Sequence, residues 1–345
     1  MGIKLDRRLN EREQCILQSI IRLYVLNNYP IGSRYLARYM EPILNLSPAS
    51  IRNVMSDLEE MEFICHPHTS AGRIPTDKGY RYFVNSLKEF EQLQPAELLT
   101  VQDNLLNANS DEILKDASKI LSLLSHYLGI VQIPHFQDIN VQKIEIIPLS
   151  STRVLLILAL ESNIVRTVNL EAHFEIEYSK ISEITSYINE RISGKSLNFI
   201  RENFKEILFE INELNKPLFR LFIDSADKIF DSRQQEDKIL IAGARQLLSA
   251  PEFDDLKRVK SVIEIIENED VIVHLLDKND DNREQMRVLI GTEMENELMN
   301  DYSMVVTSYR IGSAHGSIGL IGPKRMDYSK MMSLVDFVSK TITGR

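Results

Sequence analysis

Hydrophobic residues recur at helical spacing through the first 87 residues, where polar turns divide them into short helices. Asn10 stands before the first helix and Glu13 follows three residues later, an arrangement typical of a capping box. The apolar stripe of this helix consists of Ile16, Ile20, Leu23 and Tyr24. Pro30 and Gly32 interrupt the pattern, and Ser33 is suited to cap a second short helix over 34–40.

A third helix is predicted to begin at Ser47-Pro48, with Ser as N-cap and Pro at the first helical position. Ile51, Met55 and Leu58 share one face of it and should pack against the first two helices. The remaining positions near its N-terminus are short or polar, namely Ser47, Ala49, Ser50, Arg52, Asn53 and Ser56. Such residues contact base edges in the major groove of DNA, where Arg suits guanine and Asn suits adenine. Taken alone, Arg52 and Asn53 are equally well interpreted as ordinary solvent-facing residues.

The next segment favours the DNA-binding interpretation. Residues 63–65 and 73–74 have the character of two strands joined by a turn, and Thr76 can cap a following helix with apolar residues at helical spacing. Three helices, a hairpin and a further helix in this order predict a winged helix-turn-helix. We expect Arg73 to reach the phosphate backbone or the minor groove, and His68, Lys78 and Arg81 to lie near phosphates.

The rest of the chain changes from helical to alternating patterns. A polar stretch over 89–111 is followed by a helical stripe over 113–128 that ends at Gly129. Strand patterns then lie at 143–149, 153–160, 164–170, 286–290, 304–311 and 317–321. Asp327 is suited to cap a final helix. The fold class predicted is therefore α+β with several domains, including an antiparallel sheet flanked by helices and divided by a long insertion.

That insertion carries an apolar stripe that is a candidate dimer contact. Phe204, Ile207 and Ile211 lie on it, between Leu197 and Ser232. A stripe of this kind usually packs within its own domain, so the pattern alone leaves both interpretations open. Two-fold symmetry in a DNA target would favour dimerisation, because an inverted repeat is matched by a symmetric pair of proteins.

Composition and charge restrict the class of protein to which the chain can belong. The 345 residues are 43% hydrophobic and include two cysteines, so we expect a cytoplasmic protein without disulfides. The longest apolar run, 154–160, is far too short to span a bilayer, so we expect no membrane contact. The first 87 residues hold eleven Lys or Arg against nine Asp or Glu, an excess of +2. Because the whole chain is formally −10, the remainder carries −12. An acidic protein still binds DNA where its charge is locally basic, although a merely acidic solvated surface explains the same numbers.

Two clusters of residues could indicate a metal site or a phosphate-binding loop. Cys65, His66 and His68 could hold a metal, but their spacing is crowded and no second ligand pair follows nearby, so we expect no metal. Gly316, Gly319 and Gly322 lack the Lys-Ser/Thr of a phosphate loop and are interpreted as a hairpin turn with close backbone packing. Nucleophile and base pairings are not legible in the sequence. We therefore expect no catalytic residues, no cofactor and no enzymatic activity.

Several motifs resemble those of one family. They are Pro30-Ile31-Gly32-Ser33, Ser47 with Ala49 to Met55, Pro67 to Arg81, Ile290-Gly291 with Glu293, and Gly319 to Tyr328. Over essentially its whole length the chain resembles the heat-inducible transcription repressors, the HrcA family. The resemblance implies a winged helix, a GAF-like domain and an inserted dimerising domain.

The same resemblance implies a function. Members repress chaperone operons of the groE and dnaK type by binding double-stranded DNA, as homodimers, at an inverted-repeat operator called CIRCE, and the GroE chaperonin keeps them active. On this basis we expect a DNA-binding domain at 1–88, a linker at 89–110, a GAF-like domain at 111–195 and 256–345, and the insertion at 196–255. The alternative left open is a metabolite-responsive regulator that senses a small ligand through the GAF-like domain.

Overall fold

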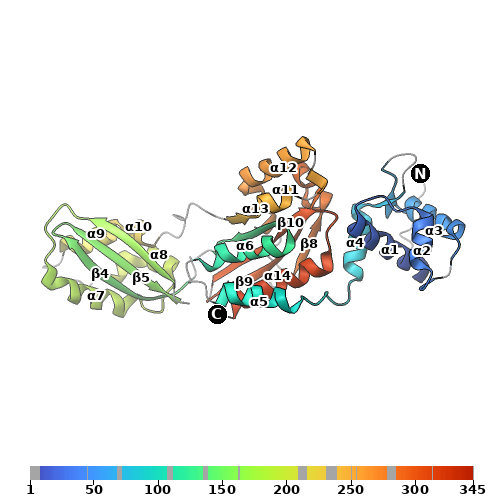
Figure 1. Cartoon of the computed structure of the whole chain (residues 1–345). Helices are drawn as coiled ribbons and strands as arrows, with labels where there is room; N and C mark the ends of the chain where they lie inside the picture. Colours follow the sequence, from blue (N-terminus) through green and yellow to red (C-terminus); the bar gives the residue numbers. More distant parts are fainter. Residues whose placement is uncertain are drawn as a thin grey trace.

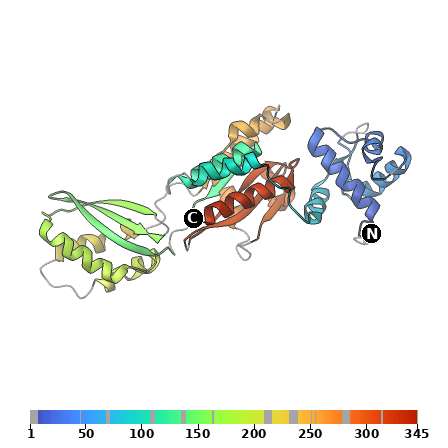
Figure 2. The ribbon, with the colours of Figure 1, turned by 60° about the horizontal axis from the view of Figure 1, so that its bottom comes forward.

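The chain folds into three parts that follow one another in a row (Figure 1). The computed structural model describes residues 8–44, 46–67, 72–106, 112–134, 139–161, 164–208, 216–230, 239–249, 251–253, 255–277, 285–312 and 314–344. An N-terminal domain lies at one end, a central domain in the middle and an outer module at the other end, and the view turned by 60° keeps this order (Figure 2).

The N-terminal domain has the predicted order of helices and hairpin. Its elements are α1 (Glu11–Asn27), α2 (Ser33–Met40), α3 (Pro48–Glu60), β1 (Ile64–Cys65), β2 (Ile74–Pro75) and α4 (Asp77–Ser86). The capping box of Asn10 and Glu13 is formed at the start of α1. Strands β1 and β2 pair antiparallel, and Ile31 forms a bridge with Arg73 that ties the hairpin to the segment before α2.

The core of this domain explains why α1 is more apolar than one stripe requires. Ile16 and Ile20 are fully buried as predicted, and Leu17 and Ile21 on the neighbouring face are fully buried too. Helix α1 contacts α2, α3, α4 and β2, so it is surrounded by the other elements. A helix buried on several faces loses the narrow apolar stripe of a surface helix.

The central domain is built on a five-stranded antiparallel sheet of order β7-β3-β10-β9-β8. Its strands are β3 (Leu128–Gln132), β7 (Ile239–Ala242), β8 (Arg287–Ile290), β9 (Tyr302–Ile311) and β10 (Ala314–Pro323). One face packs against α5 (Pro95–Leu106), α6 (Ile113–Ser125) and α14 (Tyr328–Thr343). The other face packs against α11 (Ala244–Leu248), α12 (Leu256–Glu267) and α13 (Glu269–Asp277).

Two sequence-based expectations for this domain need correction, and strand β7 was missed. The helical stripe over 113–128 stops at Ser125, because His126 takes a left-handed conformation and Leu128 already begins β3. Gly316, Gly319 and Gly322 lie within strand β10 and not in a turn. Their close backbone packing is observed, since a Cβ on Gly319 would stand 2.2 Å from the Val305 carbonyl oxygen.

The outer module has its own sheet and its own core. Strands β4 (Val141–Ser150), β5 (Arg153–Leu160) and β6 (Val165–Glu171) form an antiparallel sheet, close to their predicted bounds. Four helices pack on it, namely α7 (Tyr178–Ile192), α8 (Leu197–Ile207), α9 (Lys216–Asp224) and α10 (Ala226–Phe230).

The pairing of β3 with β7 marks where this module enters the chain. Gly129 of β3 lies opposite Ala242 of β7, and the whole outer module lies between these two strands in the sequence. Apart from Ala314 of β10, the buried residues of the module's cluster lie between Ile139 and Phe230. The inserted unit of the structure therefore starts near residue 139, well before the boundary expected at 196.

Phe204 was expected at a dimer contact, but the structure places it in the core of the outer module. Its side chain is only 2% exposed and its ring meets that of Phe230 edge-on at 4.8 Å between centroids. Ile207 is half-buried against the same cluster, and Ile211 lies outside the described residues. Phe204 therefore has almost no surface to offer a partner.

Within the described part of the chain, no helix is both long and apolar enough to cross a membrane.

Candidate nucleic-acid interface

Helix α3 presents a polar face at its N-terminus. The Ser47 hydroxyl accepts a hydrogen bond from the Ser50 amide at 3.1 Å and caps the helix, with Pro48 in its first turn. Ile51, Val54, Met55 and Leu58 are buried against the rest of the domain. The predicted face is open: Ser47, Ala49, Arg52 and Asn53 are exposed, and Ser50 and Ser56 are half-buried.

Three further arginines stand near this helix and were not singled out from the sequence. The Arg12 guanidinium in the first turn of α1 donates to the Ser50 carbonyl at 3.4 Å, which brings a positive charge beside the start of α3. Arg34 and Arg38 are exposed on α2, the helix that packs against α3. The sequence around a single Arg does not show which residues lie near it in space. These three positions could therefore be identified only from the way the helices pack in the structure.

The hairpin holds Arg73 within the domain. Its guanidinium forms an ion pair with Glu59 of α3 at 2.7 Å, and the imidazole Nδ1 of His66 lies 2.5 Å from the other oxygen of that carboxylate. The Arg73 side chain is only 16% exposed. Contact of Arg73 with DNA stays a prediction, and in the structure the residue links the hairpin to α3. His68 lies outside the described residues.

The surroundings of Cys65 do not favour a metal. Burial raises the pKa of its thiol, and the nearby Glu59 carboxylate acts in the same direction. Metal binding requires the thiolate, so a raised pKa opposes it. Among the residues that the structure describes, no group of three or more His, Cys, Asp or Glu side chains is placed to hold a metal ion.

Lys78 and Arg81 both lie on α4 and were both predicted to contact phosphates, but their surroundings differ. Lys78 is exposed and its ammonium lies 4.8 Å from the centroid of the Phe63 ring. Arg81 points to the central domain, where its Nε donates to Glu293 at 2.7 Å and its guanidinium also donates to the Val288 carbonyl. The structure thus occupies Arg81 with an interdomain contact.

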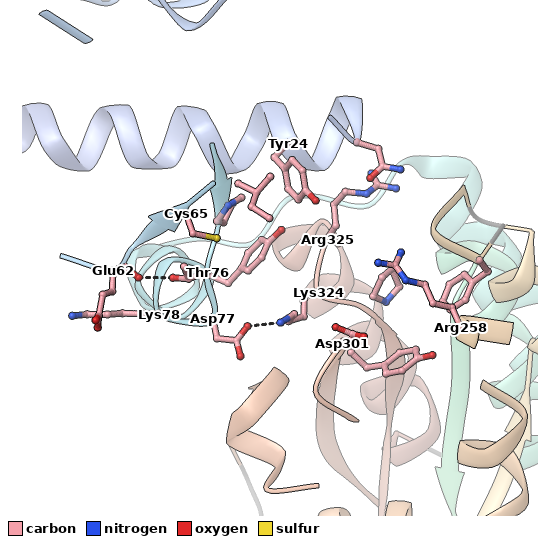
Figure 3. A pocket seen from close by; sticks show the side chains of 17 residues that line it. Tyr24, Glu62, Cys65, Thr76, Asp77, Lys78, Arg258, Asp301, Lys324 and Arg325 are labelled. Atoms are coloured by element: carbon pink, nitrogen blue, oxygen red, sulfur yellow. Dashed lines mark hydrogen bonds and ion pairs between the residues drawn. The ribbon is translucent and has the colours of Figure 1, made fainter. Parts of the chain in front are cut away.

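The junction between the N-terminal and central domains brings distant sequence motifs together. Asp77 and Lys324 form an ion pair at 2.7 Å (Figure 3), and the second oxygen of Asp77 accepts from the amide and hydroxyl of Thr292. The rings of Tyr80 and Tyr328 pack with centroids 5.8 Å apart. Beside these contacts lies a cavity of about 610 Å³ lined by both domains, including Arg258 and Lys324.

Comparisons with known proteins identify the family. The model of the HrcA protein C terminal domain matches residues 111–332. A heat-inducible transcription repressor HrcA of Chlorobium phaeobacteroides (strain BS1) is 35% identical, with 97% of each chain covered. Namesakes from Desulforamulus reducens and Halalkalibacterium halodurans are 34% and 32% identical over at least 96% of each chain.

One solved structure shares the fold. The protein described as "hypothetical protein at 2.2 A resolution" superposes with a TM-score of 0.62, covering 98% of this chain and 99% of that chain at 22% identity.

A mixed α and β fold with an open polar helix end, together with these relatives, defines a transcription repressor and not an enzyme. More narrowly, the chain belongs to the HrcA family of heat-inducible transcription repressors.

Proposed function

We propose that this protein represses chaperone operons by binding a CIRCE-type inverted repeat through its N-terminal domain, which acts as a winged helix-turn-helix. The observation that carries the proposal is the open N-terminal face of α3, where Arg52 and Asn53 are exposed while the opposite face is buried. Helices of this kind insert their N-terminal residues into the major groove. Arg12, Arg34 and Arg38 add cations suited to flanking phosphates.

The mechanism is steric. Two N-terminal domains occupy an operator that overlaps a promoter, and polymerase is excluded without any chemistry on the DNA. The mildly basic N-terminal domain binds, while the acidic remainder, with a formal charge of −12, repels phosphate elsewhere on the molecule. Binding of this electrostatic kind weakens as salt rises.

The test of DNA binding uses the full chain and two duplexes of equal length, one carrying the inverted repeat and one with its sequence scrambled. We expect at least about a thousandfold preference for the repeat at physiological salt, because specific sites commonly exceed non-specific ones by that factor. Equal affinity for both duplexes over a series of salt concentrations would contradict the proposal.

We further propose that the central domain is GAF-like and that the outer module joins two copies. Because Phe204 is buried, we infer that the contact surface lies on another part of the module. The uncovered face of its sheet carries Ile147 opposite Leu155 and Val165 opposite Ala159, and both Ile147 and Val165 are at least 41% exposed. Exposed apolar side chains on one face of a sheet are suited to self-association.

Charged substitutions on the uncovered face of the sheet test whether this face forms the dimer contact. Ile147→Lys with Val165→Lys is expected to give monomers by light scattering and weak binding to the repeat. Ser182→Lys with Ser186→Lys is the matched control for added charge, because both serines are exposed on α7, the helix that covers the other face of the sheet. An unchanged dimer for the apolar-to-charged pair would remove this face from consideration.

Chaperonin supplies the response to heat in this proposal. GroE maintains the active repressor, and heat draws it to unfolded clients, so that the repressor loses activity and the operons are expressed. The fraction of protein able to bind the repeat is to be measured after a heat step, with and without chaperonin. A fraction that chaperonin never changes would end this part of the proposal.

A small-ligand regulator is the second candidate, and the interdomain cavity is the observation that favours it. Its volume of about 610 Å³ lies within the range of ligand sites. A metabolite that raises the melting temperature of the protein in a saturable manner and changes its affinity for the repeat would support this function.

A further inference from the structure

Two ion pairs tie the N-terminal domain to the central domain, and we refer to them together as the junction pairs. They are Asp77–Lys324 and Arg81–Glu293, with separations of 212 residues or more in the sequence. Their side chains are only 22% to 31% exposed, so the charges are partly shielded from water. Ion pairs in such surroundings are screened less by salt than exposed ones.

The centre of the junction is apolar. Tyr80, Met326 and Tyr328 are at most 2% exposed, and one continuous buried cluster includes residues of both domains. Domains of one chain move relative to one another unless their interface is large and apolar. The apolar centre therefore holds the domains together, and the directional pairs around it restrict rotation.

Gly291 makes the Asp77 contact possible. Its backbone has a φ of +51°, and a Cβ built on it would stand 2.3 Å from the Asp77 carboxylate. The Arg325 guanidinium adds a further link, because it donates to the Val25 carbonyl near the end of α1. The junction is thus made by α4 and the end of α1 on one side, and by the segments around Gly291 and Lys324 on the other.

Helix α3 lies away from this junction. In Figure 1, α4 faces the central domain while α3 lies on the far side of the N-terminal domain, and the turned view agrees. The junction pairs therefore leave the open face of α3 uncovered. What they determine is the direction in which that face points.

We propose that Asp77, Arg81, Glu293 and Lys324 are positioning residues that fix the orientation of α3, so that two copies engage both half-sites of one repeat at a defined spacing. This inference rests on the proposed DNA binding and assigns Arg81 to positioning and not to phosphate contact. When the first half-site is bound, a fixed second head meets its half-site at a high effective concentration. A freely rotating head meets it at a lower one.

The test compares two double variants with unchanged net charge. Lys324→Met with Glu293→Gln removes both junction pairs, while Lys340→Met with Asp336→Asn removes an exposed pair within α14 and is the matched control. Affinity is to be measured for the full repeat, for a single half-site, and for repeats whose half-sites are moved apart by single base pairs. Removal of the junction pairs should weaken binding to the full repeat about tenfold or more and leave the single half-site within about twofold. It should also flatten the dependence on spacing.

Three results would overturn the inference. Affinity could fall equally for the full repeat and the half-site, which indicates a damaged N-terminal domain, or it could fall for neither. The control variant could also lose as much affinity as the variant without junction pairs. Small-angle X-ray scattering supplies an arm that does not depend on DNA. The variant without junction pairs should show a broader distribution of distances within the molecule than the wild type and the control. If the wild type fails to prefer the repeat, the proposed function fails, and an unchanged scattering profile would then overturn the positioning as well.

Discussion

At the residue scale, helical periodicity predicts exposure well and partners poorly. The sequence pattern put Arg52 and Asn53 on the open face of α3, where the structure has them. The same reasoning gave Arg73 and Arg81 to DNA because they are cations near the hairpin. Their carboxylate partners, Glu59 and Glu293, come from other elements, and no local pattern reveals such pairs.

Arg52 and Asn53 lead to a prediction about specificity. Replacing either by Ala should cost about 1–3 kcal/mol of discrimination at particular base pairs and little on scrambled DNA. Arg153→Ala, which removes an exposed cation in the outer module, is the control for charge alone. Binding isotherms on the repeat and the scrambled duplex, each at several salt concentrations, provide the measurement. Equal losses on both duplexes for Arg52→Ala would make it a phosphate anchor instead.

Arg73 leads to a prediction about stability. Arg73→Ala should lower the free energy of unfolding by about 1–3 kcal/mol, because it leaves the carboxylate of Glu59 without its charged partner. A double-mutant cycle with Glu59→Gln, followed by chemical denaturation, measures the coupling. Additive effects of the two substitutions would show that the pair contributes nothing to folding.

At the element scale, alternating strands were easier to predict than buried ones. Strands β4, β5 and β6 have one solvent-facing side and alternate accordingly, and their bounds follow the prediction closely. Strand β3 is buried at all five positions, so its sequence continues the apolar stripe of α6 without a change of period. Strand β7 has only four residues, and a short apolar run is equally compatible with a helix.

The glycines of β10 lead to a prediction at this scale. Gly319→Ala should destabilise the central domain by about 1–3 kcal/mol, because the added methyl group overlaps the Val305 carbonyl across the strand pair. Gly344→Ala is the control, since its Cβ would meet its nearest neighbour at 3.3 Å near the exposed end of α14. Thermal unfolding of the two variants gives the comparison. Equal melting temperatures would show that the sheet accommodates the side chain.

At the scale of the whole molecule, the buried hydrophobic clusters do not coincide with the three parts of the chain. One buried cluster continues from the N-terminal domain into the central domain, whereas the outer module has a separate cluster. The sequence could not show this division, because the residues that join the first two parts, such as Tyr80 and Tyr328, lie in motifs far apart in the chain. The insertion was expected to begin at 196 because the alternating strands before it were assigned to the central sheet, whereas in the structure β4, β5 and β6 form a sheet of their own.

This division predicts two unfolding transitions in calorimetry, one for the N-terminal and central domains together and one for the outer module. Phe222→Ala should lower only the outer transition and Leu334→Ala only the other, each by the equivalent of about 2–5 kcal/mol. A single transition that both substitutions shift equally would contradict the separation of the cores.

The central claim is that the open face of α3 directs this protein to chaperone operons and that heat releases it. Mapping of the genomic sites bound by the protein in living cells, before and after a heat step, tests this most directly. The account predicts a few strong sites, each an inverted repeat upstream of a chaperone operon, whose occupancy falls on heating and is lost in the Arg52→Ala, Asn53→Ala double variant. Sites without an inverted repeat, or occupancy that rises with heat, would contradict it.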